Sequence, residues 1–291
     1  MKTVLETIQS GTAYLEKHGV ESARLNMEQL LASVLGCARM QLYVDFDRPL
    51  DEPVLAPLRE LVRRRKERVP LQHLLASVPF FGRDFQIDGR ALIPRPETEE
   101  LVERVVGRVA AGAKEGGKPP GRVADIGCGS GVIGLTLVDR LGVPGVLADI
   151  SHEALALART NAGSLGLADR VTVVESDLFA ALGGEVFDVV AANLPYVASG
   201  ELADLEPEVA HDSAVALDGG SDGLEVMERF IDAVAPHVAE GGLVAMEIGA
   251  GQGQRLKIRF DREPIWDVSV ERDLSGNERF VFAVKRGAPP A

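Results

Sequence analysis

The sequence predicts an α/β protein in which a small helical module precedes a doubly wound, mainly parallel sheet. In roughly the first 75 residues the apolar side chains recur only at helical spacing. Further along, short apolar runs alternate with helix-like segments, as in parallel sheets whose strands are joined by helices. Between the first such run and the helix after it stands the glycine loop Asp125-Ile-Gly-Cys-Gly-Ser-Gly131. A strand, a glycine loop and a helix in succession are typical of a Rossmann-like domain.

The first 75 residues are expected to form a helical bundle, with Pro53 after Asp51 marking one helix start. The alternative is that these helices only cap the larger domain. One helix ends in the basic run 63–66 with Arg68 nearby. This run is either a solvated last turn that complements the helix dipole or a docking patch for a negatively charged partner.

Residues 76–96 are expected to form a connector, because residues 80–89 alternate apolar and polar side chains around glycines, as in a short hairpin. The third part, residues 97–291, begins with a helix from Glu97 or Thr98, followed by a solvated loop over residues 112–121. Strands are then expected at 122–126, 146–150, 171–174, 187–192, 243–248, 266–270 and 279–284, and helices at 132–141, 152–165, 224–238 and 252–260.

Composition limits the function. The chain has 291 residues, a formal charge of −13 and a pI near 4.9, so long-range attraction to nucleic-acid phosphates is unfavourable. No apolar run approaches the roughly 20 residues of a membrane helix, and an acidic residue stands too early for a secretory signal, so a cytoplasmic protein is expected. No metal site is expected. Cys37 and Cys128 are too few for a disulfide framework.

The glycine loop is the first part of a predicted cofactor site. Gly127, Gly129 and Gly131 let a ligand approach the backbone at the start of a helix, with Cys128 and Ser130 between them. A tight turn without a ligand is the alternative. Asp149 ends the next strand, where an acid commonly receives ribose hydroxyls, although it could instead cap the following helix. Cys128 fits a small residue packed under a cofactor better than a nucleophile, because no histidine is near in sequence.

The cofactor is predicted to be S-adenosylmethionine. After the third strand, Asp177 could bind the exocyclic amine of an adenine and Leu178 could cover its face. Asp125, ahead of the loop, would repel a pyrophosphate but could serve the ammonium end of S-adenosylmethionine, directly or through water. This argues against a nicotinamide dinucleotide.

The predicted substrate site is Asn193-Leu194-Pro195-Tyr196, which follows the apolar run 187–192 at a strand end. The Asn193 side-chain oxygen and the Leu194 carbonyl can each accept one N–H of a planar NH2 group, and Tyr196 can supply a flat face. Pro195 restricts the residue before it to extended conformations. Asn193 should also border the cofactor. We therefore predict methyl transfer catalysed by positioning and electrostatics, with Asn193, Pro195 and Tyr196 as the catalytic set. The alternative is an ordinary turn after a strand.

The chain resembles the release-factor glutamine N5-methyltransferases of the HemK or PrmC type over nearly its whole length. The motifs that carry the resemblance are Ala23-Arg24, residues 28–31, 70–74, Phe81-Gly82, 92–99, the glycine loop, 193–196, 217–220, 222–224, 273–276 and Arg279. The run Ile93-Pro-Arg-Pro is the most specific of them.

The resemblance implies a helical bundle joined by a β-hairpin to a seven-stranded class I methyltransferase domain. It implies S-adenosylmethionine as donor, held by Gly127 to Gly131, Asp149 and Leu178, and the glutamine of the Gly-Gly-Gln motif of class 1 peptide-chain release factors as acceptor, held by residues 193–196. It also implies that the bundle helps to bind the release factor.

The sequence departs from the family at two positions. Leu194 stands where the family usually has proline, and Ala76 stands where it commonly has glycine. Methylation of another protein glutamine, as on a ribosomal protein, and of DNA adenine N6 are the rival activities, and a non-catalytic nucleotide-binding module is a third possibility. The acidic charge argues against DNA.

Overall fold

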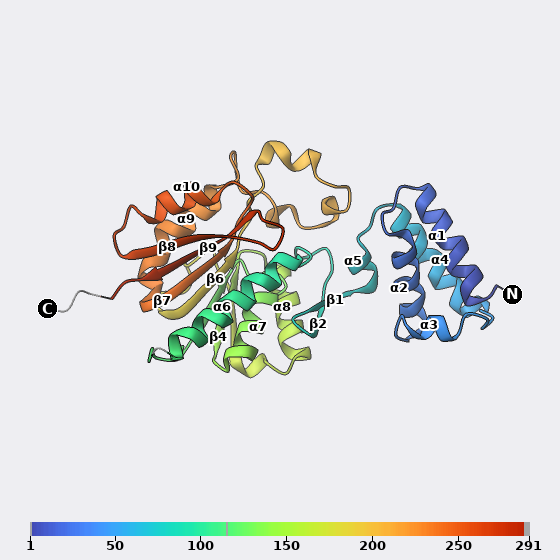
Figure 1. Ribbon diagram of the computed structural model, residues 1–291, viewed down its shortest axis with the longest axis horizontal. Coiled ribbons are helices and arrows are strands. Elements are labelled where there is room, and N and C mark those ends of the chain that lie inside the picture. The colour runs from blue at the N-terminus through green and yellow to red at the C-terminus, as the bar shows by residue number, and fades with distance from the viewer. Residues whose placement is uncertain (1, 115, 288–291) are drawn as a thin grey trace. The chain divides into compact units, whose positions relative to one another are not determined.

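The computed structural model describes residues 2–114 and 116–287, which divide into two compact units (Figure 1). The first unit runs to Ser77 and also includes Glu206–His211. The second unit comprises Val78–Leu205 and the residues from Asp212 onward. The six-residue segment of the first unit therefore comes from a part of the chain that lies, in sequence, within the second.

The first unit is a helical bundle with its own apolar core. Its helices are α1 (Val4–Lys17), α2 (Ala23–Leu35), α3 (Gln41–Val44), α4 (Glu52–Lys66), α5 (Leu71–Leu75) and the 3-10 helix η3 (Val209–His211). Thr3 and Glu6 form a capping box at the start of α1, which satisfies two backbone N–H groups of its first turn. Ile8, Leu30 and Leu58 bring the inner faces of three helices into one buried cluster.

Arg63 and Arg65 of the basic run at the end of α4, and the nearby Arg68, form ion pairs. Arg63 pairs with Glu60 on α4 and with Glu67 just after it. Arg65 and Arg68 both bind Glu208, at 2.9 and 2.7 Å. These pairs favour a structural role for the run over a patch left free for an acidic partner.

Ala76 ends α5 in the left-handed conformation, with φ of +54°. A side chain with a Cβ pays about 1–2 kcal/mol there, and glycine does not. This explains in physical terms why glycine suits the position at which the sequence has alanine.

From Ser77 on, a hairpin precedes a large sheet with helices on both faces. The elements are β1 (Ser77–Phe80), β2 (Arg83–Gln86), α6 (Pro96–Lys114), β3 (Val123–Ile126), α7 (Val132–Leu141), β4 (Gly145–Asp149), α8 (His152–Ser164), η1 (Ala168–Arg170), β5 (Val171–Glu175), β6 (Phe187–Asn193), η2 (Ser199–Asp204), η4 (Ala214–Ala216), α9 (Glu225–Val234), η5 (Ala235–His237), β7 (Val238–Glu247), α10 (Gly253–Phe260), β8 (Trp266–Arg272) and β9 (Glu278–Lys285).

The seven-stranded sheet has the order β5-β4-β3-β6-β7-β9-β8. The strands from β5 to β7 are parallel, and β9 runs antiparallel to both of its neighbours. Alternate strand residues such as Val189 and Val190 enter two separate buried clusters, one with α6, α7 and α8 and the other with α9 and α10. Helices therefore cover both faces of the sheet, as Figure 1 shows. This is the predicted doubly wound, class I methyltransferase architecture.

Three element boundaries differ clearly from the prediction. The helix expected over 224–238 ends as an α-helix at Val234 and continues as the 3-10 turn η5 to His237, because Pro236 has no N–H to donate to the carbonyl four residues earlier. As a consequence β7 begins at Val238, earlier than the expected residue 243. The other helix, α6, continues to Lys114, into a segment expected to be a loop.

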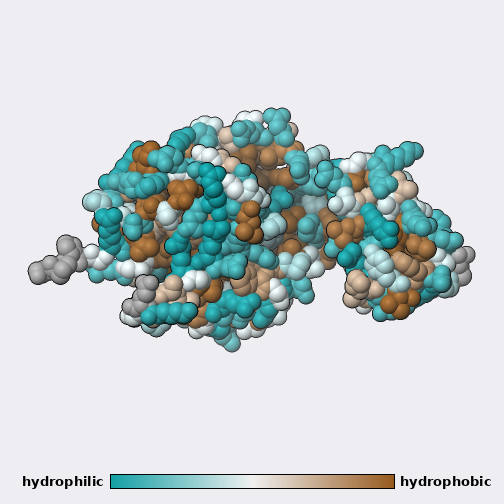
Figure 2. All heavy atoms as spheres, in the orientation of Figure 1, coloured by the Kyte–Doolittle hydropathy of each residue, from teal (hydrophilic) through white to brown (hydrophobic). Residues whose placement is uncertain are grey.

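Hydrophilic side chains cover much of the face seen in Figure 2, with hydrophobic residues dispersed among them. In residues 2–114 and 116–287, no helix combines the length and hydrophobicity needed to cross a bilayer.

Candidate active site

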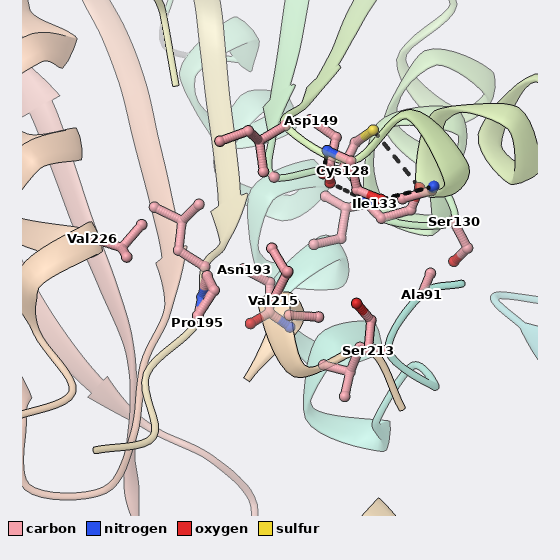
Figure 3. A pocket seen from close by; sticks show the side chains of 18 of the residues that line it. Ala91, Cys128, Ser130, Ile133, Asp149, Asn193, Pro195, Ser213, Val215 and Val226 are labelled. Carbon is pink, nitrogen blue, oxygen red and sulfur yellow. Dashed lines mark hydrogen bonds between the residues drawn. The ribbon is translucent and has the colours of Figure 1, made fainter. Parts of the chain in front are cut away.

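A cavity of about 370 Å³ opens in the second unit at the carboxyl ends of β3, β4 and β6 (Figure 3). This volume lies within the range of about 300–1,000 Å³ that small-molecule sites occupy. The glycine loop, the acid that ends β4, the segment after β5 and the tetrapeptide at the end of β6 all contribute to its wall. Residues 90–92 and Pro94 of the connector contribute as well. The segments that were predicted separately from the sequence thus lie together at one edge of the sheet.

The glycine loop is held by backbone hydrogen bonds to the neighbouring strand. The N–H groups of Gly127 and Cys128 donate to the Ala148 carbonyl at 2.8 and 3.0 Å. Gly127 and Gly131 have φ of +72° and +84°, values that residues with a Cβ adopt only with strain. The predicted loop residues 127–130 line the cavity, whereas Gly131 caps α7 and packs against buried side chains.

Asp149 reaches the cavity with a fixed carboxylate. Its two oxygens accept the N–H groups of Gly129 and Ser151, each at 2.8 Å. Burial raises the pKa of Asp149, and these backbone hydrogen bonds oppose the rise. The helix that follows takes its cap from the Ser151 side chain. The capping alternative for Asp149 is therefore weaker than a role toward the cavity.

Asp125 stands behind the loop and is completely buried. One of its oxygens accepts the Gly134 N–H at 2.7 Å, and the other has no hydrogen-bond partner among the described residues. Burial raises the pKa of Asp125 to about 7. In this structure the carboxyl braces the start of α7, and its side chain is closed off from solvent.

The segment after β5 presents Asp177 and Leu178 to the cavity. Leu178 has φ of +51°, a strained value, and its carbonyl accepts the Ser176 hydroxyl at 2.8 Å. Asp177 pairs with Arg229, which also lines the cavity. A ligand amine would have to share the Asp177 carboxylate with this arginine.

Three residues of the tetrapeptide line the cavity, namely Asn193, Leu194 and Pro195. The Asn193 side-chain oxygen is buried and has no hydrogen-bond partner in residues 2–114 and 116–287. Leu194 is buried against the glycine loop, where a Cβ on Gly127 would lie 2.7 Å from its Cδ2 atom. The leucine side chain at this position thus packs under the glycine loop.

Tyr196 lies differently from its neighbours. Its half-buried ring packs against the apolar cluster shared with α9 and α10, outside the cavity lining. Burial raises the pKa of its hydroxyl, and the charge of Glu247 raises it further. Its predicted role as a flat face for a substrate amide stays a prediction.

The backbone of the tetrapeptide is braced by residues 217–223, a segment that sequence reasoning recognised only through the family resemblance. The Gly219 N–H donates to the Val197 carbonyl at 2.8 Å, and the Gln252 side chain donates to the carbonyls of Tyr196 and Gly223 at 3.0 and 3.2 Å. A Cβ on Gly223 would lie 2.5 Å from the Tyr196 carbonyl oxygen. Glycine is therefore required for this close approach.

Asn161 is a positioning residue that sequence reasoning missed. It is completely buried on α8, and its side chain exchanges two hydrogen bonds with the Gln86 backbone and donates to the Ser130 carbonyl at 2.9 Å. It thereby ties the hairpin to the glycine loop. An asparagine in an otherwise apolar helical face was the only available signal.

Cys128 is buried, and burial raises the pKa of its thiol well above the ordinary value. A protonated, enclosed thiol is a poor nucleophile, which favours the packing role. In the part of the chain that the structure describes, no group of three His, Cys, Asp or Glu side chains could hold a metal ion.

Two family models match the sequence. The PrmC N-terminal domain matches residues 6–75, and the methyltransferase small domain matches residues 114–235.

Curated relatives match almost end to end. The release factor glutamine methyltransferase of Geobacter sulfurreducens is 38% identical over 281 residues, which are 96% of this chain and 95% of the relative. That of Rhodopirellula baltica is 35% identical over 289 residues, 97% of this chain and 96% of the relative.

Solved structures agree on the fold at low sequence identity. The human Mettl16 catalytic domain in complex with the MAT2A 3′UTR hairpin 6 is 16% identical with a TM-score of 0.56, over 81% of this chain and 82% of that one. A methyltransferase from Pyrococcus furiosus is 17% identical with a TM-score of 0.51, over 72% and 91%. These likenesses concern the fold alone.

Proposed function

The chain belongs to the release factor glutamine methyltransferase family, and from this premise we propose that it methylates a release-factor glutamine. The donor is S-adenosylmethionine. The acceptor is the side-chain nitrogen N5 of the glutamine in the Gly-Gly-Gln motif of class 1 peptide-chain release factors. The activity is placed in the cytoplasm, with no nucleic acid as the direct substrate.

The observation that carries the proposal is the Asn193 side-chain oxygen, buried at the cavity and without a partner among the described residues. A buried acceptor left unpaired costs about 1–3 kcal/mol. An incoming carboxamide N–H would satisfy it. The backbone carbonyl of Leu194 is proposed to accept the second N–H, so that the nitrogen is held in one orientation.

The residues of the cavity fit the proposed cofactor. The Asp149 carboxylate, already oriented by two N–H groups, suits ribose hydroxyls, while Leu178 and Ile133 supply apolar wall for an adenine. When bound, S-adenosylmethionine supplies an electrophilic methyl group. Gly127, Gly129, Ser130, Asp177 and Asn193 complete the proposed binding set, Cys128 packs within it, and Gly131 supports the loop from behind.

The acceptor site is proposed to act by orientation and electrostatics. Asn193 and Leu194 hold the nitrogen, and Pro195 keeps the preceding backbone extended. Tyr196, next in the chain, is proposed to meet the glutamine side chain beyond the cavity lining. Because an amide nitrogen is delocalised, correct placement carries most of the catalytic effect. No covalent enzyme intermediate is required.

The proposal assigns a different role to each of the three parts of the chain. Residues 1–75 bind the release factor, residues 76–96 connect, and residues 97–291 carry methyl transfer. The match of residues 6–75 to the PrmC N-terminal domain supports the first assignment.

The rival acceptors are less well supported. The curated relatives are named for release factors, not for ribosomal proteins or DNA. A net charge of −13 also opposes the binding of duplex DNA that base flipping requires.

The test is transfer of radiolabelled methyl from S-adenosylmethionine to a class 1 release factor, with a Gly-Gly-Ala factor as control. Label should enter the Gly-Gly-Gln factor only. Absence of label from the intact factor would refute the proposal.

Two variants separate the two halves of the site. Asn193→Ala should abolish transfer and leave the Kd for S-adenosylmethionine within about threefold, because its main contact is with the acceptor. Asp149→Ala should instead weaken cofactor binding by about tenfold or more, the loss expected for hydrogen bonds to a carboxylate. Equal effects of both variants on cofactor binding would contradict these roles.

A further inference from the structure

A buried polar chain lies beneath Asn193, on the side away from the proposed acceptor. Asn193 and Glu247 end the adjacent strands β6 and β7 and are register partners. Thr98, on the first turn of α6, joins them. Its hydroxyl donates to Glu247 at 2.7 Å and accepts from the Asn193 Nδ2 atom at 3.5 Å. Thr98 is 2% exposed and Glu247 is 1% exposed, so bulk water does not compete for these bonds.

The chain has a direction that follows from its chemistry. An ionised carboxylate only accepts hydrogen bonds, so the single hydroxyl hydrogen of Thr98 is committed to Glu247. The Thr98 oxygen can then only accept from Asn193, and it must meet the NH2 end of that amide. The carbonyl end of Asn193 is directed the other way, as its unpartnered oxygen shows.

We propose that Glu247, acting through Thr98, is the positioning residue that determines which end of the Asn193 amide faces the substrate. This inference rests on the proposed methyl transfer to glutamine. An asparagine with the opposite orientation would present two donors to the acceptor NH2 group, which needs acceptors. Orientation of one side-chain amide therefore decides whether the site can hold a carboxamide nitrogen.

Protonation of Glu247 would reverse the chain. A neutral carboxyl can donate to Thr98, whose hydroxyl is then free to donate to Asn193 and to draw its carbonyl inward. Burial raises the pKa of Glu247 to about 7. The hydrogen bond from Thr98, the charge of Arg279 and a smaller direct contribution from the Asn193 side chain oppose this rise, and the charge of Glu97 adds to it. The charge of Glu247 in turn raises the pKa of Tyr196. Transfer should therefore decline as the pH falls through about 7.

The experiment uses the full chain with Thr98→Val, which keeps the shape but removes the hydroxyl, and Thr98→Ser as the matched control. With a release factor at pH 8, Thr98→Val should lower kcat by about tenfold or more, the effect of one buried hydrogen bond. Thr98→Ser should recover kcat to within about threefold of wild type. The Kd for S-adenosylmethionine should change by less than about threefold in both.

The pH profile and NMR distinguish positioning from mere stability. The decline near pH 7 should be present in wild type and Thr98→Ser and absent in Thr98→Val. In protein labelled with ¹⁵N-asparagine, the Asn193 side-chain NH2 signals should shift over the same pH range in wild type and in Thr98→Ser. They should not shift in Thr98→Val, which lacks the hydroxyl. This second readout needs no methyl transfer.

Any of three results would overturn the inference. They are a kcat of Thr98→Val equal to that of wild type, an equal loss of kcat in Thr98→Ser and Thr98→Val, and a pH profile of Thr98→Val that matches the wild-type profile. A different result would separate the two proposals. If the wild-type protein methylates no release factor but its Asn193 signals still shift with pH in the way that depends on Thr98, the proposed function is wrong and the inference about the orientation of Asn193 still holds.

Discussion

The buried carboxyl of Asp125 should make the second unit less stable as the pH rises. Its pKa is about 7 in the folded protein, against 3.8 for an ordinary aspartate, because burial disfavours its charged form. An acid whose folded pKa is raised stabilises the fold fully below pH 3.8, and this contribution is lost as the pH rises to about 7. The interval from pH 5 to pH 7 spans two units, which at about 1.4 kcal/mol per unit amounts to about 3 kcal/mol.

Asp125→Asn removes this dependence. At pH 5 the carboxyl of the folded wild type is neutral and, like the amide, can accept from the Gly134 N–H, so the gap in stability between wild type and variant should be small. Between pH 5 and pH 8 this gap should widen by about 3 kcal/mol in favour of the variant. For a unit of this size, that difference raises the Tm by roughly 6–12 °C.

The assay is thermal unfolding at both pH values, followed by fluorescence. Trp266 is the one tryptophan of the sequence and is buried in β8, so it reports on the unit that contains Asp125. Thr136→Val, a buried substitution on α7 without a titrating group, should shift the Tm equally at pH 5 and pH 8. If the gap between wild type and Asp125→Asn is the same at both pH values, the reasoning from burial is wrong.

Three further predictions concern backbone supports. Asn161→Ala removes three hydrogen bonds to backbone groups and should lower the free energy of unfolding by about 2–4 kcal/mol, measured by denaturant titration. Gly223→Ala should abolish methyl transfer, because the added Cβ would lie 2.5 Å from the Tyr196 carbonyl oxygen. Gly183→Ala is the control, because Gly183 also has a positive φ but has open space around it. This control should lose only about 1–2 kcal/mol of stability and keep the activity. Equal activity loss in the two alanine variants would contradict this account. Ala76→Gly should raise the free energy of unfolding by about 1 kcal/mol, because glycine adopts the left-handed conformation of this position without strain. The measurement is the denaturant midpoint, which should increase. An unchanged midpoint would show that Ala76 is not strained.

The sequence predicted the strands and most helices because each depends on local periodicity. The strand run 187–192 and the glycine loop after Ile126 lie close to where the structure has them, since apolar runs and glycines act over a few neighbouring residues. The end of α9 was misplaced because helical spacing continues past Pro236, whereas the α-helical hydrogen bonds stop and a 3-10 turn follows.

The supporting contacts of the site could not be predicted in the same way. Thr98 and Glu247 are 149 positions apart, and their bond depends on strand order and register, which the periodicity of one strand does not contain. The three contacts of Asn161 likewise join segments that only the folded sheet brings together. Local pattern identified the residues that touch the cavity, and the tertiary fold determined which residues hold them.

The position of β9 has a consequence for the order of assembly during synthesis. It is the last strand along the described chain, yet it lies between β7 and β8 inside the sheet. Until residues 278–285 leave the ribosome, β7 exposes an unpaired edge of hydrogen-bonding groups, and β8 has no strand beside it. Such open edges invite pairing with other nascent chains. A molecular chaperone that shields the β7 edge during translation should therefore increase the yield of native enzyme.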